Sequence, residues 1–245
     1  MKKSLLEIFK KIDEKKPLTV LEKIEYINYS ITNHGGKMEN IDSISTSCLC
    51  NARCKKRMEN KNFICSECYA VATIERYSNS DPGKLDMYDK MERNTAFYSY
   101  YELAKDCIPT ITSRIFRFES FGDLNNKLQF KNYCMLARVK QNNHCTFALW
   151  TKTPDIIADA IKDGVSIPKN MVIVYSIPKK NWIPTRQQMM NIKKKHPFIK
   201  KFFVVVTKDF QKKHKIKINC QKKCYTCQKC YTKADRTQLI IELEK

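Results

Sequence analysis

The sequence predicts an α/β protein, either a partial (β/α) barrel or an open parallel sheet of βα units, with N-terminal helices and cysteine-rich loops. Three observations predict it. Short β-rich apolar runs alternate with helical segments from about residue 110, and the repeat is about 30 residues, the length of a βαβ unit. The runs are almost continuously apolar, which is typical of parallel strands covered on both faces. Nine of the twelve cysteines lie outside this series, in two groups.

Helices are expected before the βα series. Residues 3–12 carry apolar side chains at helical spacing, and Thr19 is placed to cap a second helix. Residues 41–68 are polar and rich in cysteine without a clear period, which predicts a loop organised by a bound group. Residues 69–106 have a helical pattern again.

The βα series itself contains four expected strands and three expected helices. The strands are predicted at residues 110–118, 146–151, 171–177 and 201–207. The helices are predicted at residues 131–141, 154–164 and 184–196. Ligands of parallel sheets gather at the carboxyl ends of the strands. The chain is therefore divided into an N-terminal helical segment 1–38, an α/β domain 39–232 with its βα units at 110–210, and a C-terminal tail 233–245.

The charge of the chain is uneven. The formal net charge is +21, and the part from Lys169 to the end holds 20 Lys and Arg against 4 Asp and Glu. A basic half favours a polyanionic partner, and nucleic acid is the first candidate. The alternative is that these lysines occupy ordinary solvent-exposed positions without binding a partner. The lysines expected to contact phosphates are Lys193, Lys194, Lys195, Lys212, Lys213, Lys215 and Lys217.

No targeting or membrane segment is visible. The N-terminus is charged throughout and lacks the apolar core of a secretory signal. No run approaches the roughly 18 apolar residues that a membrane span needs. We therefore expect a cytoplasmic protein with no membrane partner. Thiols stay reduced in the cytoplasm, so clustered cysteines there indicate metal ligands more readily than disulfides.

The C-terminal cysteine set, Cys220, Cys224, Cys227 and Cys230, falls within eleven residues. Four thiolates on so short a loop can surround a compact iron–sulfur cube. Zinc more often uses two pairs separated by a longer insert. We therefore expect a 4Fe-4S cluster at this set, with zinc as the alternative.

The N-terminal group contains five cysteines, Cys48, Cys50, Cys54, Cys65 and Cys68. The pair Cys65 and Cys68 has chelating spacing, and two of the other three complete a four-thiolate site. We assign Cys48 and Cys54 as these two ligands, which leaves one cysteine spare. Zinc and an iron–sulfur cluster both stay open here, as does one site shared by the two ends of the chain.

Charged residues follow two of the predicted strands. Arg117, Glu119 and Asp123 stand where the first strand of the series passes into its loop, and Lys152 follows the second. At strand ends such groups can hold a ligand or transfer protons, so all four are candidate catalytic residues lining a cleft. Gly122 is one of only five glycines and is expected to meet a backbone requirement. Solvated charges in a turn are the alternative.

The order of these motifs resembles the phage "gene product 88" domain family over roughly residues 40–232. The motifs are Cys68-Tyr69-Ala70, Arg93-Asn94, RFESFGD at residues 117–123, Trp150-Thr151-Lys152 and the terminal cysteine set. Phe121 between Ser120 and Gly122, and Trp150 in place of the usual Tyr, depart from the family pattern. The family is distantly similar to radical S-adenosylmethionine proteins. The resemblance implies a related fold, bound metal and a setting in a phage or plasmid within a bacterial host.

The leading hypothesis is a mobile-element iron–sulfur protein with a radical-S-adenosylmethionine-like α/β fold that acts on or binds nucleic acid. One alternative is a radical S-adenosylmethionine enzyme that modifies another substrate, which requires a cluster with an open iron and S-adenosylmethionine as cofactor. Another is a zinc-stapled structural adaptor. The sequence leaves open whether the protein is an enzyme.

Overall fold

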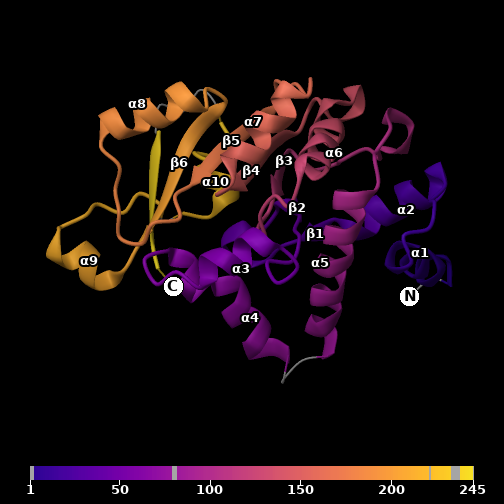
Figure 1. The fold of residues 1–245 in the computed structure, drawn as a ribbon, viewed down its shortest axis with the longest axis horizontal. Helices are drawn as coiled ribbons and strands as arrows, with labels where there is room; N and C mark the ends of the chain where they lie inside the picture. The colour runs from indigo at the N-terminus through magenta and orange to yellow at the C-terminus, as the bar shows by residue number, and fades with distance from the viewer. Residues whose placement is uncertain (1–2, 79–81, 221, 233–237, 245) are drawn as a thin grey trace.

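The computed structural model describes residues 3–78, 82–220, 222–232 and 238–244. Its centre is one seven-stranded sheet whose strands follow one another in chain order (Figure 1). Only the first pair, β1 and β2, is antiparallel, and every later pair is parallel. The sheet is open, so the predicted α/β fold with parallel βα units is confirmed in that form. The strands are β1 (Thr32–Asn33), β2 (Asp42–Ile44), β3 (Ile115–Phe118), β4 (Thr146–Thr151), β5 (Met171–Ser176), β6 (Ile199–Val206) and β7 (Leu239–Leu243).

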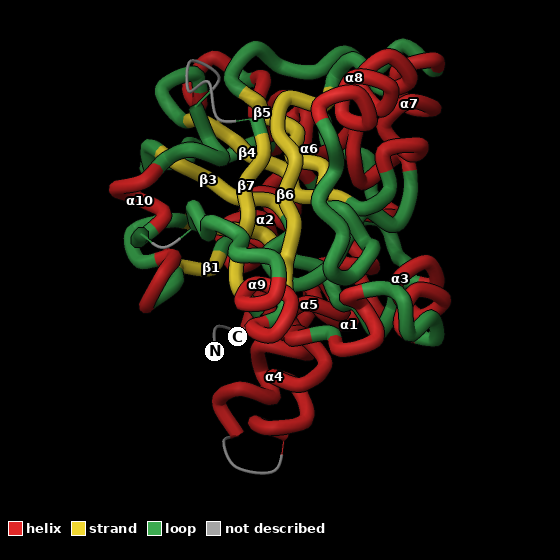
Figure 2. The backbone as a smooth tube through the Cα atoms, turned by 90° about the vertical axis from the view of Figure 1, so that its left-hand side faces the viewer, coloured by secondary structure: helices red, strands yellow, loops and turns green. Residues whose placement is uncertain are grey.

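Helices cover the sheet on both faces. Figure 2 shows α7 and α8 on one side of the strands and α10 on the other. We call the face under α6, α7 and α8 the outer face and the opposite one the inner face. The helices are α1 (Lys3–Asp13), α2 (Val20–Ser30), α3 (Ala52–Met58), α4 (Tyr69–Ser78), α5 (Pro82–Tyr100), α6 (Lys127–Arg138), α7 (Pro154–Lys162), α8 (Arg186–Lys195), α9 (Lys208–Lys213) and α10 (Cys224–Cys227). Short 3₁₀ turns occur at η1 (Gly36–Met38), η2 (Ile64–Glu67), η3 (Lys105–Cys107) and η4 (Lys140–Asn142).

The second N-terminal helix begins where its capping residue predicts. Thr19 accepts a hydrogen bond from the backbone N–H of Glu22, and the Glu22 side chain accepts one from the backbone N–H of Thr19. This reciprocal capping box satisfies two donors that the first turn of a helix leaves free. It fixes the start of α2, which packs with α1 and α5 beside the sheet (Figure 1).

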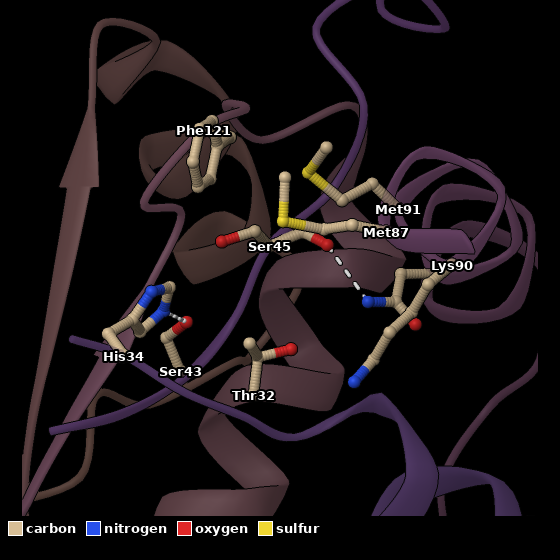
Figure 3. Close-up of a pocket in the computed structure, with 9 residues that line it drawn as sticks. Thr32, His34, Ser43, Ser45, Met87, Lys90, Met91 and Phe121 are labelled. Atoms are coloured by element: carbon tan, nitrogen blue, oxygen red, sulfur yellow. Dashed lines mark hydrogen bonds between the residues drawn. The ribbon is translucent and has the colours of Figure 1, made fainter. Parts of the chain in front are cut away.

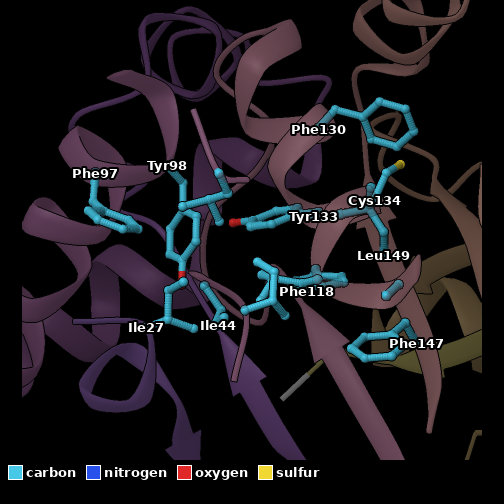
Figure 4. Packing of buried hydrophobic residues seen from close by; sticks show 14 of the residues in the cluster. Ile27, Ile44, Phe97, Tyr98, Phe118, Phe130, Tyr133, Cys134, Phe147 and Leu149 are labelled. Atoms are coloured by element: carbon cyan, nitrogen blue, oxygen red, sulfur yellow. The ribbon is translucent and has the colours of Figure 1, made fainter. Parts of the chain in front are cut away.

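Aromatic rings fill the core under the outer face (Figure 4). Phe118 of β3 stacks on Tyr133 of α6, with ring centroids 4.2 Å apart, and on Phe147 of β4, with centroids 5.6 Å apart. All three side chains are fully buried. Stacked rings add to the free energy gained from burial alone, so this group holds α6 against the middle of the sheet.

The inner face is covered by the end of the chain. Successive side chains of a strand point to opposite faces, so Ala148 and Trp150 of β4 point inward while Phe147 and Leu149 point outward. Tyr231 packs into this inner cluster together with the cysteine loop that precedes it. The C-terminal cysteine set therefore lies against the sheet and not on a free tail.

Three strands were not expected from the sequence. Residues 32–33, expected within the N-terminal helical segment, form β1. Residues 42–44, expected in a loop, form β2, and residues 239–243, expected in a tail, form β7 and pair with β6 along their whole length. Residues 233–237 and 245 of the expected tail lie outside the described residues. A strand of three residues shows no period in the sequence, so β2 is defined only by its pairing with β3. Of the described helices, none combines the length and the apolar character needed to cross a membrane.

Candidate metal centres

The N-terminal cysteine segment lies across the carboxyl ends of the parallel strands. It follows β2 directly. Asn51 Nδ2 donates a hydrogen bond of 2.9 Å to the carbonyl oxygen of Asp123, in the loop after β3. Arg57 Nη2 of α3 donates one of 3.1 Å to the carbonyl oxygen of Lys152, just after β4. Each bond ties the segment to the end of a different strand.

The same segment continues to the end of β5. The backbone N–H of Ile64 donates to the carbonyl oxygen of Pro178 over 2.8 Å, and the N–H of Lys180 donates to the carbonyl oxygen of Asn62 over 2.9 Å. Lys180 also forms an ion pair with Glu67. The segment thus meets the ends of β3, β4 and β5 in turn, at the edge where parallel α/β sheets bind their ligands.

Four of the five N-terminal cysteines form one group: Cys48, Cys54, Cys65 and Cys68. Cys48 and Cys68 shift the pKa values of one another most strongly. Electrostatic interactions link Cys54 to Cys48 and to Cys65, and Cys65 to Cys68. Cys50 interacts instead with Ser47 and Glu92. The four grouped thiols are those assigned as ligands from the sequence, and their role as ligands stays a prediction.

One thiol of this group is set apart by its surroundings. Interactions with the Cys48 thiol and with the backbone N–H groups of Val71 and Ala70 at the start of α4 lower the pKa of Cys68 to about 6. The pKa of Cys48 is raised by its interaction with Cys68 and by burial. Cys68 is the only one of the four whose pKa is lowered.

Asp123 connects the segment to the sheet. Its side chain is 2% exposed and accepts five hydrogen bonds. Oδ2 accepts from Arg57 Nη1 at 3.0 Å and from the backbone N–H of Lys152 at 3.1 Å. Oδ1 accepts from the hydroxyls of Thr151 and Thr153 and from the backbone N–H of Leu124. The role seen for Asp123 is thus to join α3 to the ends of β3 and β4.

Lys152 faces the cysteines. Burial lowers the pKa of the Lys152 ammonium, but its interactions with Cys65, Asp123 and Cys54 raise it above the ordinary value overall. Arg57 contributes a second positive charge near Cys54 and Cys65. Arg57 was not singled out from the sequence. Its spacing of three residues from Cys54 on one helix places both on the same face and is the signal that identifies it.

Glu119 lies apart from these groups. The backbone at Glu119 has φ of 60°, a left-handed conformation that is uncommon outside glycine. Its carboxylate turns toward α6 and is 2% exposed. It accepts hydrogen bonds from Gln129 Nε2 and Tyr133 Oη at 2.6 Å each, and from the Thr46 hydroxyl at 2.9 Å. The structure thus brings Asp123 and Lys152 together but places Glu119 in a separate buried network.

We expect Glu119 to make stability fall as pH rises. Burial raises the pKa of Glu119 from 4.5 to about 7. A raised folded-state pKa gives stability that is complete below pH 4.5 and is lost as pH rises through about 7. The change amounts to about 3 kcal/mol. Replacing Glu119 with Gln should flatten this part of the profile in urea unfolding between pH 4.5 and 8.

The matched control for this profile is Glu102→Gln. The Glu102 side chain is 62% exposed and pairs with Lys131 at the surface. Its substitution should leave the pH profile parallel to that of the unmodified protein. A Glu119→Gln profile that keeps the full slope would show that Glu119 ionises normally in the folded state.

The C-terminal cysteine set lines a single pocket of about 20 Å³ beside β7. The pocket is bounded by all four thiols and by Lys222, Lys229 and Tyr231. Lys37 Nζ donates a hydrogen bond of 3.2 Å to the Cys220 sulfur and forms an ion pair with Glu242 of β7. Within the described part of the chain, no three Cys, His, Asp or Glu side chains are already arranged as the ligands of one metal ion.

A second pocket, of about 10 Å³, lies between β1, β2 and α5. Figure 3 shows His34 and Ser43 on one side of it and Lys90 on the other. Burial lowers the pKa of Lys90 to about 8, and Lys90 Nζ donates to the carbonyl oxygen of Ile31. The pocket has about the volume of one water molecule. We assign no ligand to it.

The lysines expected to contact nucleic acid occupy two separate places. Lys193, Lys194 and Lys195 end α8, just before β6 begins, whereas the other four lie in α9 and the turn after it, beyond the end of β6. The eight residues of β6 separate the two places by roughly 25 Å. Nucleic-acid binding stays a prediction.

Comparison of the chain with protein-family models, curated proteins and solved structures finds no match. The resemblance to the "gene product 88" family therefore stays a prediction.

Proposed function

We propose that this protein binds metal through its two cysteine sets and is an iron–sulfur protein. The metal site of the N-terminal set lies at the edge of the sheet where parallel α/β proteins bind their ligands. One observation carries the proposal: residues 48–68 cross the carboxyl ends of β3, β4 and β5 and group four thiols there. Four thiols grouped in one loop are typical of a metal site with thiolate ligands.

The residues around both sets suit a negatively charged thiolate centre. Lys152 and Arg57 stand near the N-terminal set, and Lys37 donates a hydrogen bond to Cys220 of the C-terminal set. Such cations and donors offset thiolate charge and tune the metal. The pocket of about 20 Å³ has room for a single ion. An iron–sulfur cube requires the half-buried thiols of that exposed loop to move outward.

A bound cluster would supply one-electron chemistry at the edge of the sheet. The chain's own residues would then hold the reacting molecule. Lys152 presents an ammonium group toward this edge, and Tyr69, the first residue of α4, is 56% exposed and packs against Phe121 with ring centroids 5.7 Å apart. Asp123 holds the backbone of Lys152 in place through the N–H bond described above.

The test is metal analysis of cysteine variants purified without oxygen. The double variant Cys48→Ser, Cys68→Ser should lose the metal of the N-terminal set and keep that of the other set. The double variant Cys224→Ser, Cys227→Ser should show the reverse. Serine removes the soft thiolate that these metals select, with little change in volume.

Cys50→Ser is the matched control, because Cys50 lies in the same segment but interacts with Glu92 and Ser47. It should retain the full metal content, as should Cys134→Ser in the core of α6. Equal loss of metal in the Cys50 variant and in the first double variant would contradict the assignment of ligands.

The radical S-adenosylmethionine activity implied by the resemblance is a narrower form of this proposal. It requires that the N-terminal set bind a cluster with an open iron, which leaves one of its four thiols unused. Release of 5′-deoxyadenosine from S-adenosylmethionine by the reduced protein would support it, and no release from protein shown to hold its cluster would exclude it.

A further inference from the structure

Three buried polar groups on the inner face of the sheet have no hydrogen-bond partner among the described residues: Arg117 Nε, Trp150 Nε1 and Tyr231 Oη. Trp150 is 7% exposed and Tyr231 is 2% exposed. A buried donor without a partner costs about 1–3 kcal/mol, and folded proteins leave few such groups. Three of them in one cluster indicate a partner that is not among the described residues.

These groups belong to one cluster. The Arg117 guanidinium carbon lies 4.0 Å from the centre of the Trp150 ring, and the Trp150 and Tyr231 rings are 5.4 Å apart. Arg117 and Trp150 come from neighbouring parallel strands, β3 and β4, and Tyr231 follows the C-terminal cysteine set. Segments that are distant in the sequence thus bring three side chains with donor groups into one cluster.

The charge of Arg117 also lacks a counter-charge. Among the described residues, its only hydrogen bond runs from Nη1 to the Met38 sulfur at 3.5 Å, and it forms no ion pair. The groups that favour its charged form most are phenols and thiols, those of Tyr231, Tyr69, Cys224 and Cys230. Arginine stays charged in proteins, and a buried charge without a partner is strongly unfavourable.

We propose that Arg117, Trp150 and Tyr231 form a binding site for the oxyanion of a small molecule, a carboxylate or a phosphate group. All three groups can donate, and the guanidinium fork matches both oxyanions. Burial of the two rings restricts the site to a terminal group and excludes a polymer backbone. Tyr231, Cys224 and Cys230 also line the pocket at the C-terminal set, so the bound group lies beside that set. The inference does not require a metal to be present.

The experiment uses the fluorescence of Trp150. The chain has two tryptophans, Trp150 and Trp182, so the full-length Trp182→Phe protein reports on Trp150 alone. Inorganic phosphate and acetate are titrated separately at constant ionic strength, and metal content is measured on the same samples. We expect a saturable change with at least one of the two anions. Saturation by phosphate alone identifies a phosphate-bearing ligand, and by acetate alone a carboxylate-bearing one.

Variants locate the site. Arg117→Gln should weaken binding at least tenfold, whereas Arg114→Gln, at an exposed position three residues earlier, should leave it unchanged. Tyr231→Phe removes only a hydroxyl and should weaken binding severalfold. This variant tests the proposal if Arg117→Gln does not fold. The proposal is overturned if neither anion saturates the signal below about 10 mM, or if Arg117→Gln or Tyr231→Phe binds like the parent. Because metal content is measured on the same samples, this result is separable from the metal analysis.

Discussion

Replacing Asp123 with Ala is expected to destabilise the protein by about 3–5 kcal/mol. Asp123 is the buried acceptor for five donors, and Arg57 pairs with it at 3.0 Å with only 13% of its own side chain exposed. Removing the carboxylate leaves a largely buried guanidinium and two threonine hydroxyls without their acceptor. The free energy of unfolding in urea measures the loss.

The same substitution should also release the N-terminal cysteine segment from the sheet, because Arg57 of α3 holds it there. The Asp123→Ala protein should therefore lose metal from the N-terminal set before it unfolds. Asp159→Ala is the matched control, since Asp159 is 55% exposed and pairs with Lys162 at the surface. It should cost less than about 1 kcal/mol.

A double substitution separates the contribution of the Arg57–Asp123 ion pair from the independent effects of the two single substitutions. Removing Arg57 together with Asp123 eliminates both charges, so the double variant should lose less stability than the sum of the two single variants. Additive losses would show that Arg57 and Asp123 do not stabilise one another.

Replacing Gly122 with Ala is expected to cost about 3 kcal/mol. A Cβ atom at this position would lie 2.5 Å from both the carbonyl oxygen and the hydroxyl oxygen of Thr46, and 2.7 Å from a carboxylate oxygen of Glu119. The Thr46 carbonyl belongs to the backbone and cannot rotate away. The loop after β3 must therefore shift, and with it the Glu119 network.

Gly35→Ala is the control for this effect. Gly35 has φ of −94°, and no atom lies within 4 Å of the position that its Cβ would take. Its substitution should change stability by less than about 1 kcal/mol. If thermal or urea unfolding shows the two variants to be equally stable, the close approach at Gly122 is not a constraint on the fold.

The central strands were predictable because a strand that is buried on both faces has apolar residues at nearly every position. The strand at 146–151 has the predicted bounds, and the helix after it begins at the predicted proline. β2 was not predictable, because three residues carry no period. β7 is an apolar run of five residues, and it was missed because it lies beyond the cysteine loop.

The site was only partly predictable. Spacing in the sequence indicates that one of five cysteines is spare, but only the path of the chain shows Cys50 turned toward Glu92. The direction of the Glu119 side chain depends on the left-handed backbone conformation at this residue. No sequence pattern predicts that conformation for a residue other than glycine. That Arg117 forms no ion pair with any of the described residues is likewise visible only in the structure.

The most direct test of the account is the metal content of the unmodified protein purified under strictly anaerobic conditions. The account predicts iron and acid-labile sulfide in equal amounts, with broad visible absorption that disappears when a chelator removes the iron. Zinc in place of iron would contradict the iron–sulfur assignment while leaving the thiolate sites in place. A folded protein that carries no metal, with all eight cysteines of the two sets free, would contradict the account as a whole.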